Sequence, residues 1–295
     1  MSFADLSWTS QDGLILHARD YAPIGEVSGV PVICIHGLTR NARDFEDLAP
    51  RIAATGRRVI AVDVRGRGRS ARDPQPLNYH PGTYAMDIVA LLDATGVDRA
   101  VFVGTSMGGI IAMVLASIRP EAIAGAVLND VGPELAPAGL ARIGGYVGGG
   151  FAFATWDEAA AYAKAINGAA FPTYADADWT VFARRLVDET PDGTLALAYD
   201  PDIAAPFKAA DPEAPPADMY PLFRALAACG PVLLVRGAIS DLIDRPIVER
   251  MRAAAPLMTY VEVPEVGHAP MLTEPAAWKA LGAFLRGASL DVIAT

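Results

Sequence analysis

Residues 104–108 are Gly104-Thr105-Ser106-Met107-Gly108, and they directly follow the apolar run Ala100-Val101-Phe102-Val103. The run predicts a buried strand, and the apolar segment 109–116 predicts a helix. Between them the chain must turn sharply, and the two glycines leave space where a Cβ would collide with neighbouring backbone. A strand, a sharp turn and a helix in this order hold the Ser106 hydroxyl above the edge of a sheet.

Short apolar runs recur along the chain, and helical or mixed segments separate most of them. The sequence predicts strands at 30–35, 58–62, 100–103, 124–128, 231–235 and 258–263. It also predicts an opening hairpin, with strands at 6–10 and 14–18 around Gln11-Asp12-Gly13, and helices at 84–94 and 275–285. Short Val/Ile-rich runs separated by helices are typical of a parallel sheet covered on both faces. We therefore expect an α/β fold with a mostly parallel central sheet flanked by helices.

This alternation breaks between residues 132 and 218, where Pro and Gly separate helical pieces. We interpret 132–218 as an inserted helical cap, and 1–131 together with 219–295 as the core domain. The cap carries aromatic residues that we expect to pack mainly on one another, with only a few facing a ligand: Phe151, Phe153, Trp156, Tyr162, Phe171, Trp179 and Phe182.

The composition limits the class of protein. Hydrophobic residues make up 52% and charged residues 20% of 295, which is typical of a globular chain. The start of the chain lacks the pattern of a secretory signal, so we expect a cytoplasmic protein. The formal charge of −10 argues against a nucleic-acid partner, because phosphate binding needs clustered Lys and Arg. We expect no membrane contact, and the oligomeric state stays open.

We expect no chemical role for the cysteines or for a local cluster of arginines. The two cysteines, Cys34 and Cys229, adjoin apolar runs and are expected to be buried and unpaired. The sequence shows no His, Cys or Asp grouping with metal-ligand spacing. The basic cluster of Arg65, Arg67, Arg69 and Arg72 is expected to form a solvated face.

A serine hydroxyl becomes a good nucleophile only when an imidazole takes its proton and a carboxylate orients that imidazole. His17 and His80 do not follow a predicted core strand, whereas His36 and His268 do. His268 follows the strand at 258–263, in a loop that should reach the same sheet edge as Ser106. We therefore expect His268 to be the base and His36 to shape its own loop.

For the orienting acid, the first choice is Asp241, because it follows the strand at 231–235 in the loop 236–241. Asp244 lies three residues further on, and Asp130 follows the strand at 124–128, so both remain alternatives. Backbone N–H groups of Leu38, after the strand at 30–35, and of Met107, directly after Ser106, are the expected oxyanion donors.

Together these residues resemble the α/β-hydrolase family, in its serine-nucleophile branch with a cap. The resemblance covers nearly the whole chain: His36-Gly37, the stretch 63–70, the turn at Ser106, the Asp241 loop and Gly267-His268. It implies Ser106 as nucleophile, His268 as base, Asp241 as its orienter, Leu38 and Met107 as oxyanion donors, and no cofactor or metal. In that family the stretch 63–70 is a structural turn rather than a phosphate loop.

This sequence differs from the family pattern at two positions, and each difference argues against one kind of reaction. The family's dehalogenases and epoxide hydrolases carry Asp where this chain has Ser106, which argues against alkyl-enzyme chemistry. Leu38 follows Gly37 without the further glycines of lipase-type oxyanion loops, which argues against bulky tertiary esters.

The resemblance implies a carboxylic ester hydrolase, with a small ester or lactone and water as its reactants. One alternative is a hydrolase of carbon–carbon bonds in vinylogous diketones from aromatic ring cleavage, for which Arg142, Arg184 and Arg185 are the candidate carboxylate-binding residues. A minor alternative is a ligand-binding receptor that keeps the triad without turnover.

Overall fold

The structure is a computed structural model, and it describes residues 2–209 and 217–287. Within these residues an eight-stranded sheet has the order β1-β2-β4-β3-β5-β6-β10-β11. In that order, the strands are Ala4–Thr9, Ile15–Tyr21, Val59–Asp63, Val32–Ile35, Ala100–Thr105, Ile123–Asn129, Val232–Gly237 and Thr259–Val263. The pairs β1–β2 and β2–β4 are antiparallel and the other pairs are parallel. The predicted fold, a mostly parallel sheet that opens with a hairpin, is therefore confirmed.

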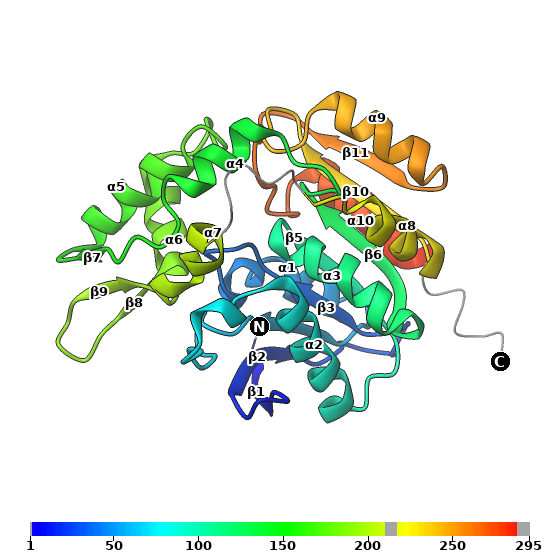
Figure 1. The fold of residues 1–295 in the computed structure, drawn as a ribbon, viewed down its shortest axis with the longest axis horizontal. Coiled ribbons are helices and arrows are strands. Elements are labelled where there is room, and N and C mark those ends of the chain that lie inside the picture. The colour runs from blue at the N-terminus through cyan, green and yellow to red at the C-terminus, as the bar shows by residue number, and fades with distance from the viewer. Residues whose placement is uncertain (1, 210–216, 288–295) are drawn as a thin grey trace.

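Helices cover both faces of this sheet (Figure 1). On β3, Val32 and Cys34 point into the hydrophobic core that contains α1 (Leu48–Ala53) and α10 (Pro275–Gly287). Ile33 and Ile35 point into the opposite core, which contains α2 (Pro81–Thr95), α3 (Met107–Ile118), α8 (Tyr220–Cys229) and α9 (Arg245–Ala254). Both sets of side chains are buried, which explains why the strand is apolar at every position.

The helix predicted at 84–94 is confirmed, but α2 begins earlier, at Pro81. The His80 side chain accepts a hydrogen bond from the Gly82 N–H, and proline at the first helical position has a φ suited to a helix. The helix ends at Gly96, whose φ of 64° is left-handed.

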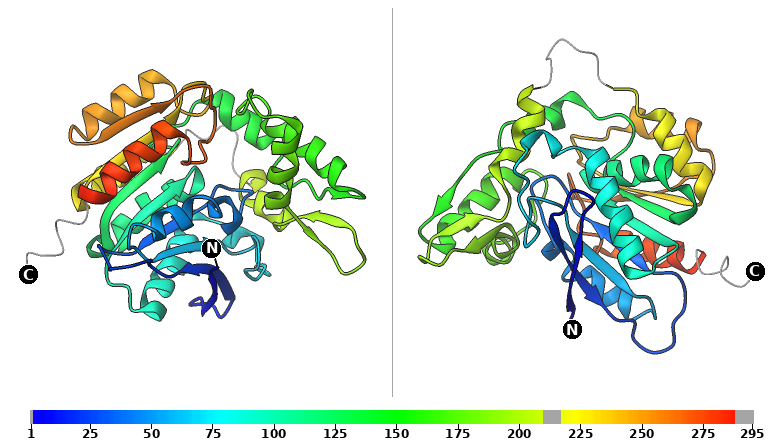
Figure 2. Two further views of the ribbon diagram at one scale, coloured as in Figure 1. Left: turned by 180° about the vertical axis from the view of Figure 1, so that it is seen from behind. Right: turned by 60° about the horizontal axis from the view of Figure 1, so that its bottom comes forward.

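A separate lobe comes from the chain between β6 and α8, and it lies beside the core in the views of Figures 1 and 2. Its helices are α4 (Pro137–Gly144), α5 (Trp156–Asn167), α6 (Asp176–Leu186) and α7 (Ala205–Ala209). It also contains a small antiparallel sheet of β7 (Ala152–Phe153), β9 (Leu195–Leu197) and β8 (Val187–Glu189), which the sequence did not predict. Among the described residues, short 3₁₀ turns also lie in the core at Ala42–Phe45, Pro76–Asn78 and Pro120–Ala122, and in this lobe at Pro201–Ala204.

We call the residues 132–209 of this lobe the inserted segment. Residues 210–216 of the predicted cap, and residues 1 and 288–295 of the predicted core, lie outside the described residues. Within the part of the chain that the structure describes, every helix is too short or too polar to span a bilayer. Both cysteines are free; Cys34 is buried and Cys229 is half-buried.

Aromatic side chains form the interior of the inserted segment. Rings of Phe171, Tyr174, Trp179 and Phe182 lie 4.6–6.5 Å apart, centroid to centroid. Tyr162 contacts Phe151 and Phe153 at 5.1 and 5.2 Å. The expectation that these residues pack mainly on one another is confirmed.

Candidate active site

Ser106 lies at the turn between β5 and α3, with φ 51° and ψ −118°. A Cβ on Gly104 would lie 2.4 Å from the Gly108 carbonyl carbon, and one on Gly108 would lie 2.1 Å from the Ile35 oxygen. The turn is therefore so tight that both positions require glycine. A positive φ at a serine is strained and is kept only by the packing around it, which here holds the hydroxyl at the sheet edge.

His268 lies in the loop after β11, and its Nε2 is 3.0 Å from the Ser106 Oγ. The two residues are 162 positions apart in the chain. They meet because β5 and β11 are parallel strands of one sheet, so their following loops leave at the same edge. The His268 side chain is only 8% exposed.

Asp130, and not Asp241, accepts a hydrogen bond from His268. The Asp130 Oδ2 lies 2.8 Å from the His268 Nδ1. The carboxylate also accepts hydrogen bonds from the Gly237 N–H at 2.9 Å and from the Ser240 hydroxyl at 2.6 Å. Asp130 is fully buried and has a φ of 54°, a left-handed conformation that Asp tolerates better than most residues.

The prediction that Asp241 orients His268 is wrong for a local reason. The loop after β10 turns so that Ser240 faces Asp130, and Asp241 points to the inserted segment. There its two oxygens accept hydrogen bonds from Arg142 Nε and Nη2 at 2.6 and 2.8 Å. The hydrogen bond from Arg142 is also the main reason that the pKa of Asp241 is lowered.

The remaining alternative acid, Asp244, caps a helix. Its side chain accepts a hydrogen bond from the Ile247 N–H at 2.8 Å, at the start of α9. Asp130 could be found from the sequence by one signal, because it directly follows a predicted strand that pairs with the strand of Ser106. That signal did not outweigh the position of Asp241.

The three side chains define which imidazole nitrogen carries the proton. A carboxylate only accepts hydrogen bonds, so His268 Nδ1 donates to Asp130. His268 Nε2 is then free to accept the Ser106 hydroxyl proton. The site therefore contains a serine hydroxyl placed to give its proton to an imidazole.

The expected oxyanion donors flank Ser106. Met107 is the first residue of α3, so its N–H has no acceptor within the helix. Leu38 follows Gly37, and a Cβ on Gly37 would lie 3.6 Å from the Ser106 Cβ. The structure thus places the loop after β3 directly against the serine.

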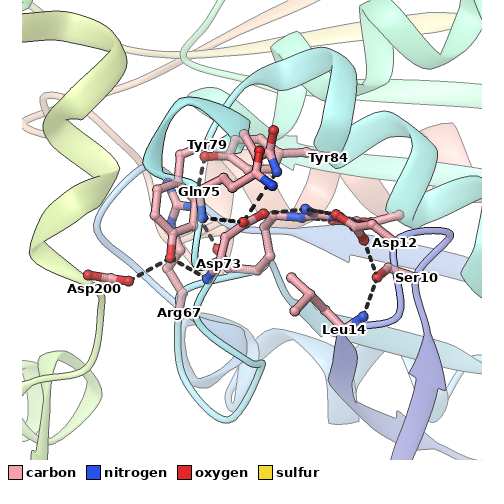
Figure 3. Close-up of polar contacts among 12 residues, drawn as sticks. Ser10, Asp12, Leu14, Arg67, Asp73, Gln75, Tyr79, Tyr84 and Asp200 are labelled. Atoms are coloured by element: carbon pink, nitrogen blue, oxygen red, sulfur yellow. Dashed lines mark hydrogen bonds and ion pairs between the residues drawn. The ribbon is translucent and has the colours of Figure 1, made fainter.

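Arg67 connects both of these donor residues, a contact that sequence reasoning missed. Its Nε donates to the Leu38 carbonyl at 2.9 Å, and its Nη2 lies 3.7 Å from the Met107 Sδ. Its Nη1 donates to the Tyr84 hydroxyl at 2.9 Å. Figure 3 shows Arg67 and Tyr84 in a network that Tyr79 extends to Asp200 of the inserted segment, through a 2.6 Å hydrogen bond.

The basic cluster is therefore only partly a solvated face, contrary to expectation. Arg65 and Arg67 are each 1% exposed, whereas Arg69 and Arg72 lie at the surface. Arg65 is surrounded by carboxylates, with hydrogen bonds to Asp12, Asp73 and Asp87. Its burial follows from this neutralisation, because a buried guanidinium is stable only when it is paired.

His36 shapes its own loop, as expected. Its Nε2 accepts the Val64 N–H at 3.0 Å, so its Nδ1 carries the proton that is donated to the Gly37 carbonyl at 2.7 Å. Burial lowers the pKa of His36 to about 4. This neutral imidazole supports the backbone just before Leu38.

A cavity of about 80 Å³ lies over Ser106 and His268. The core contributes Leu38, Thr39, Arg40, Met271 and Leu272 to its walls, and the inserted segment contributes Ile143, Tyr146, Ile166, Asn167, Phe171, Phe182 and Leu186. The inserted segment therefore forms one wall of the candidate site. Such a cavity is small beside the few hundred Å³ of drug-sized ligand sites.

The three arginines predicted as carboxylate-binding residues do not line this cavity. Arg142 pairs with Asp241, Arg185 pairs with Asp47 at the surface, and Arg184 stacks on Trp156 with 4.4 Å from its Cζ to the ring centroid. The cavity is lined instead by Arg40.

The sequence matches a family model described as the alpha/beta hydrolase fold over residues 30–275. A similar curated protein is a 3-hydroxybutyrate-oligomer hydrolase of Cupriavidus necator, 39% identical over 278 residues, which are 92% of this chain and 94% of that protein. An Escherichia coli esterase is 37% identical over 118 residues, which are 40% of this chain and 45% of the esterase.

A solved structure with a similar fold is that of an alpha/beta hydrolase from Novosphingobium aromaticivorans. It is 45% identical, covers 97% of this chain and 99% of its own, and superposes with a TM-score of 0.88.

Proposed function

Because this chain belongs to the α/β-hydrolase family, we propose that it is a serine hydrolase that cleaves a small carboxylic ester through an acyl-enzyme. One observation carries this proposal, the continuous hydrogen-bonded series from Ser106 through His268 to Asp130. Asp130 takes the orienting role for which Asp241 was first expected.

In the acylation step, the Ser106 Oγ attacks the ester carbonyl carbon while His268 Nε2 takes the hydroxyl proton. Asp130 stabilises the imidazolium that forms. The tetrahedral intermediate collapses when the carbon–oxygen bond to the leaving alcohol breaks and His268 protonates that oxygen. The acyl group remains on Ser106.

In the deacylation step, His268 takes a proton from water, and the resulting hydroxide attacks the acyl carbon. The bond to Ser106 then breaks, its oxygen regains the proton from His268, and the acid leaves. In both steps the backbone N–H groups of Leu38 and Met107 would stabilise the negative oxygen. Each such donor contributes about a hundredfold to a thousandfold in rate.

The substrate class follows from the cavity and the relatives. A cavity of about 80 Å³ favours a short acyl group. The Cupriavidus necator relative is named for hydrolysis of 3-hydroxybutyrate oligomers, which are linear esters of a short hydroxy acid. We therefore propose short linear oligoesters of hydroxy acids as the leading substrates, ahead of lactones.

The inserted segment acts in this proposal as a cap that limits what reaches Ser106, since it supplies one wall of the cavity. The arginines expected to hold the substrate carboxylate in carbon–carbon bond hydrolysis, Arg142, Arg184 and Arg185, lie outside the cavity walls, so that alternative would have to use Arg40 instead. The cytoplasmic location stays a prediction.

Labelling and turnover together test the proposal. Mass spectrometry after treatment with a serine-directed phosphonate should show one adduct on Ser106, and the adduct should be absent from Ser106→Ala. The wild type should release acid from 3-hydroxybutyrate dimer or aryl acetates, with a burst of alcohol where deacylation is slow.

Other results would support one of the alternative functions or contradict the assignment of Ser106. Turnover of a ring-cleavage dienoate without turnover of esters would support the carbon–carbon alternative. Tight ligand binding without Ser106-dependent turnover would support the receptor alternative. An adduct on another residue would contradict the assignment of Ser106 as nucleophile.

A further inference from the structure

Arg40 is a cationic side chain in the wall of the cavity that contains Ser106. Among the described residues that line this cavity, no other Lys or Arg occurs. The Arg40 Cγ and the Ser106 Cβ each lie 3.6 Å from the place that a Cβ on Gly37 would occupy. The Arg40 side chain therefore leaves its loop on the side that faces Ser106, and its Cγ lies close to that serine.

The Arg40 guanidinium is held in one orientation. Its Nε lies 2.9 and 3.0 Å from the two oxygens of Asp44, and its Nη2 also donates to Asp44. The Phe182 ring covers one face, with its centroid 4.2 Å from the Arg40 Cζ. The Arg40 and Asp44 side chains are 13% and 12% exposed.

These contacts use only part of the donor capacity of Arg40. A guanidinium carries five N–H groups, and Asp44 engages those of Nε and Nη2. Within the described residues, no acceptor binds the Arg40 Nη1. Nη1 is also not one of the fully buried side-chain atoms without a partner, so it is in contact with solvent. The two N–H groups of Nη1 are thus not used by the described residues, and they belong to a side chain that lines the cavity.

The surroundings favour an anion at that position. Ile143, Phe171 and Leu186 contribute apolar walls, which strengthen electrostatic interactions by excluding water. Arginine is well suited to a carboxylate, because its planar donors match the two oxygens. Asp44 also lines the cavity, where it fixes the guanidinium and lowers the net charge of the Arg40–Asp44 pair, so a bound anion can leave again.

We propose that Arg40 is the binding site for the terminal carboxylate of a hydroxy-acid oligoester, an inference that rests on the proposed ester hydrolysis. In such an oligoester, one hydroxy-acid unit separates the free carboxylate from the nearest ester carbonyl. An oligoester anchored at Arg40 would present that ester to Ser106. The enzyme would then release single hydroxy acids from the carboxylate end of the chain.

Two substrates that share one internal ester and differ in the charge of their ends test this inference, and the measured rate for both is cleavage of that internal ester. The linear dimer of 3-hydroxybutyrate carries the carboxylate, and its methyl ester lacks it. Arg40→Met should lower kcat/KM for the dimer by about 10- to 100-fold, the effect of losing a hydrogen bond to a charged group. For the methyl ester it should change kcat/KM by less than about threefold, because no charged contact is lost.

Two further variants give the comparison its controls. Arg40→Lys keeps the charge and should recover part of the activity on the dimer. Arg184→Met removes the same charge from an exposed position on the inserted segment, outside the cavity walls, and should leave both substrates unaffected.

A measurement on the unmodified protein covers the case in which Arg40→Met does not fold. The product anion 3-hydroxybutyrate should inhibit hydrolysis of the methyl ester competitively, and added salt should weaken that inhibition. 3-Hydroxybutyramide, which is neutral and contains no ester, should not inhibit at the same concentration.

Failure of the two ideas gives different results. If the wild type hydrolyses neither substrate nor aryl acetates, the proposed ester hydrolysis is wrong. If it hydrolyses the dimer and Arg40→Met lowers both substrates equally or neither, the carboxylate site is wrong while the ester hydrolysis stands. Equal inhibition by 3-hydroxybutyramide and by the 3-hydroxybutyrate anion would also overturn the site.

Discussion

The carboxylate of Asp130 lies 2.8 Å from the Nδ1 of His268, although 138 residues separate them in the chain. Asp130 directly follows β6, the neighbour of the strand that ends just before Ser106, and His268 follows β11 at the same edge of the sheet. The acid of the candidate triad thus comes from a strand between those of the nucleophile and the base.

Replacing Asp130 should cost far more activity than replacing Asp241. In Asp130→Asn the amide can donate to His268 Nδ1 and favour the wrong tautomer, so we expect kcat to fall by about 10³- to 10⁴-fold. Asp241→Asn breaks a partly exposed ion pair with Arg142 and should change kcat less than about fivefold. Steady-state kinetics on an aryl acetate measures both. A larger loss in Asp241→Asn would restore that residue as the orienting acid.

Arg67 should act as a positioning residue for the oxyanion donors. Arg67→Met removes the hydrogen bond to the Leu38 carbonyl, so kcat should fall by about 10- to 100-fold with little change in KM. Tyr84→Phe is the matched control, because it removes another hydrogen bond of Arg67 but no contact to Leu38. A rise in KM with kcat preserved would mean that Arg67 serves substrate binding instead. Circular dichroism should show that both variants fold.

Alanine at Gly104 should destabilise the protein. Its Cβ would lie 2.4 Å from the backbone of Gly108 and Gly109, and overpacking of this kind costs about 1–3 kcal/mol or more. Gly144→Ala is the control, because no atom lies within 4 Å of its new Cβ and alanine favours the helix by up to about 1 kcal/mol. Urea denaturation compares the free energies of unfolding. Similar stability of Gly104→Ala and wild type would show that the turn relaxes.

Protonation of His36 should weaken the fold in acid. Its folded-state pKa, about 4, lies below the ordinary histidine value, because burial disfavours the charged ring. A depressed histidine pKa means that the unfolded chain binds the proton first. The stability from neutral His36 is therefore complete above pH 6.5 and is lost as the pH falls toward 4.

Nitrogen NMR of the imidazole can follow this titration. The ring should stay neutral, with its proton on Nδ1, at pH 5 and should titrate near pH 4. Titration of His36 near the ordinary histidine value of 6.5 would show that burial has little effect on the ring. The free energy of unfolding should fall between pH 7 and pH 4.5.

The strands and the turn at Ser106 were predictable because their signals are local. A strand covered on both faces is apolar at every position, and the turn needs glycine at 104 and 108 because backbone leaves no space for a Cβ. His268 was also predictable, since a residue that directly follows a parallel strand must lie at the sheet edge.

Asp241 was misjudged because its position depends on a loop. Three residues separate it from β10, and each turn of the loop changes where its side chain points. Arg142, on the inserted segment, provides the partner that draws the Asp241 carboxylate away from His268. No local pattern reports a contact between residues 99 positions apart.

The sequence by itself determined the strands of the central sheet, the glycine turn and the pair Ser106 and His268, because these follow from periodicity and from short-range sterics. Only the tertiary structure decided that Asp130 serves His268, that Arg67 supports Leu38 and that Arg40 lines the cavity. Those contacts depend on how loops and the inserted segment pack, and packing is set by side chains that are distant in the chain.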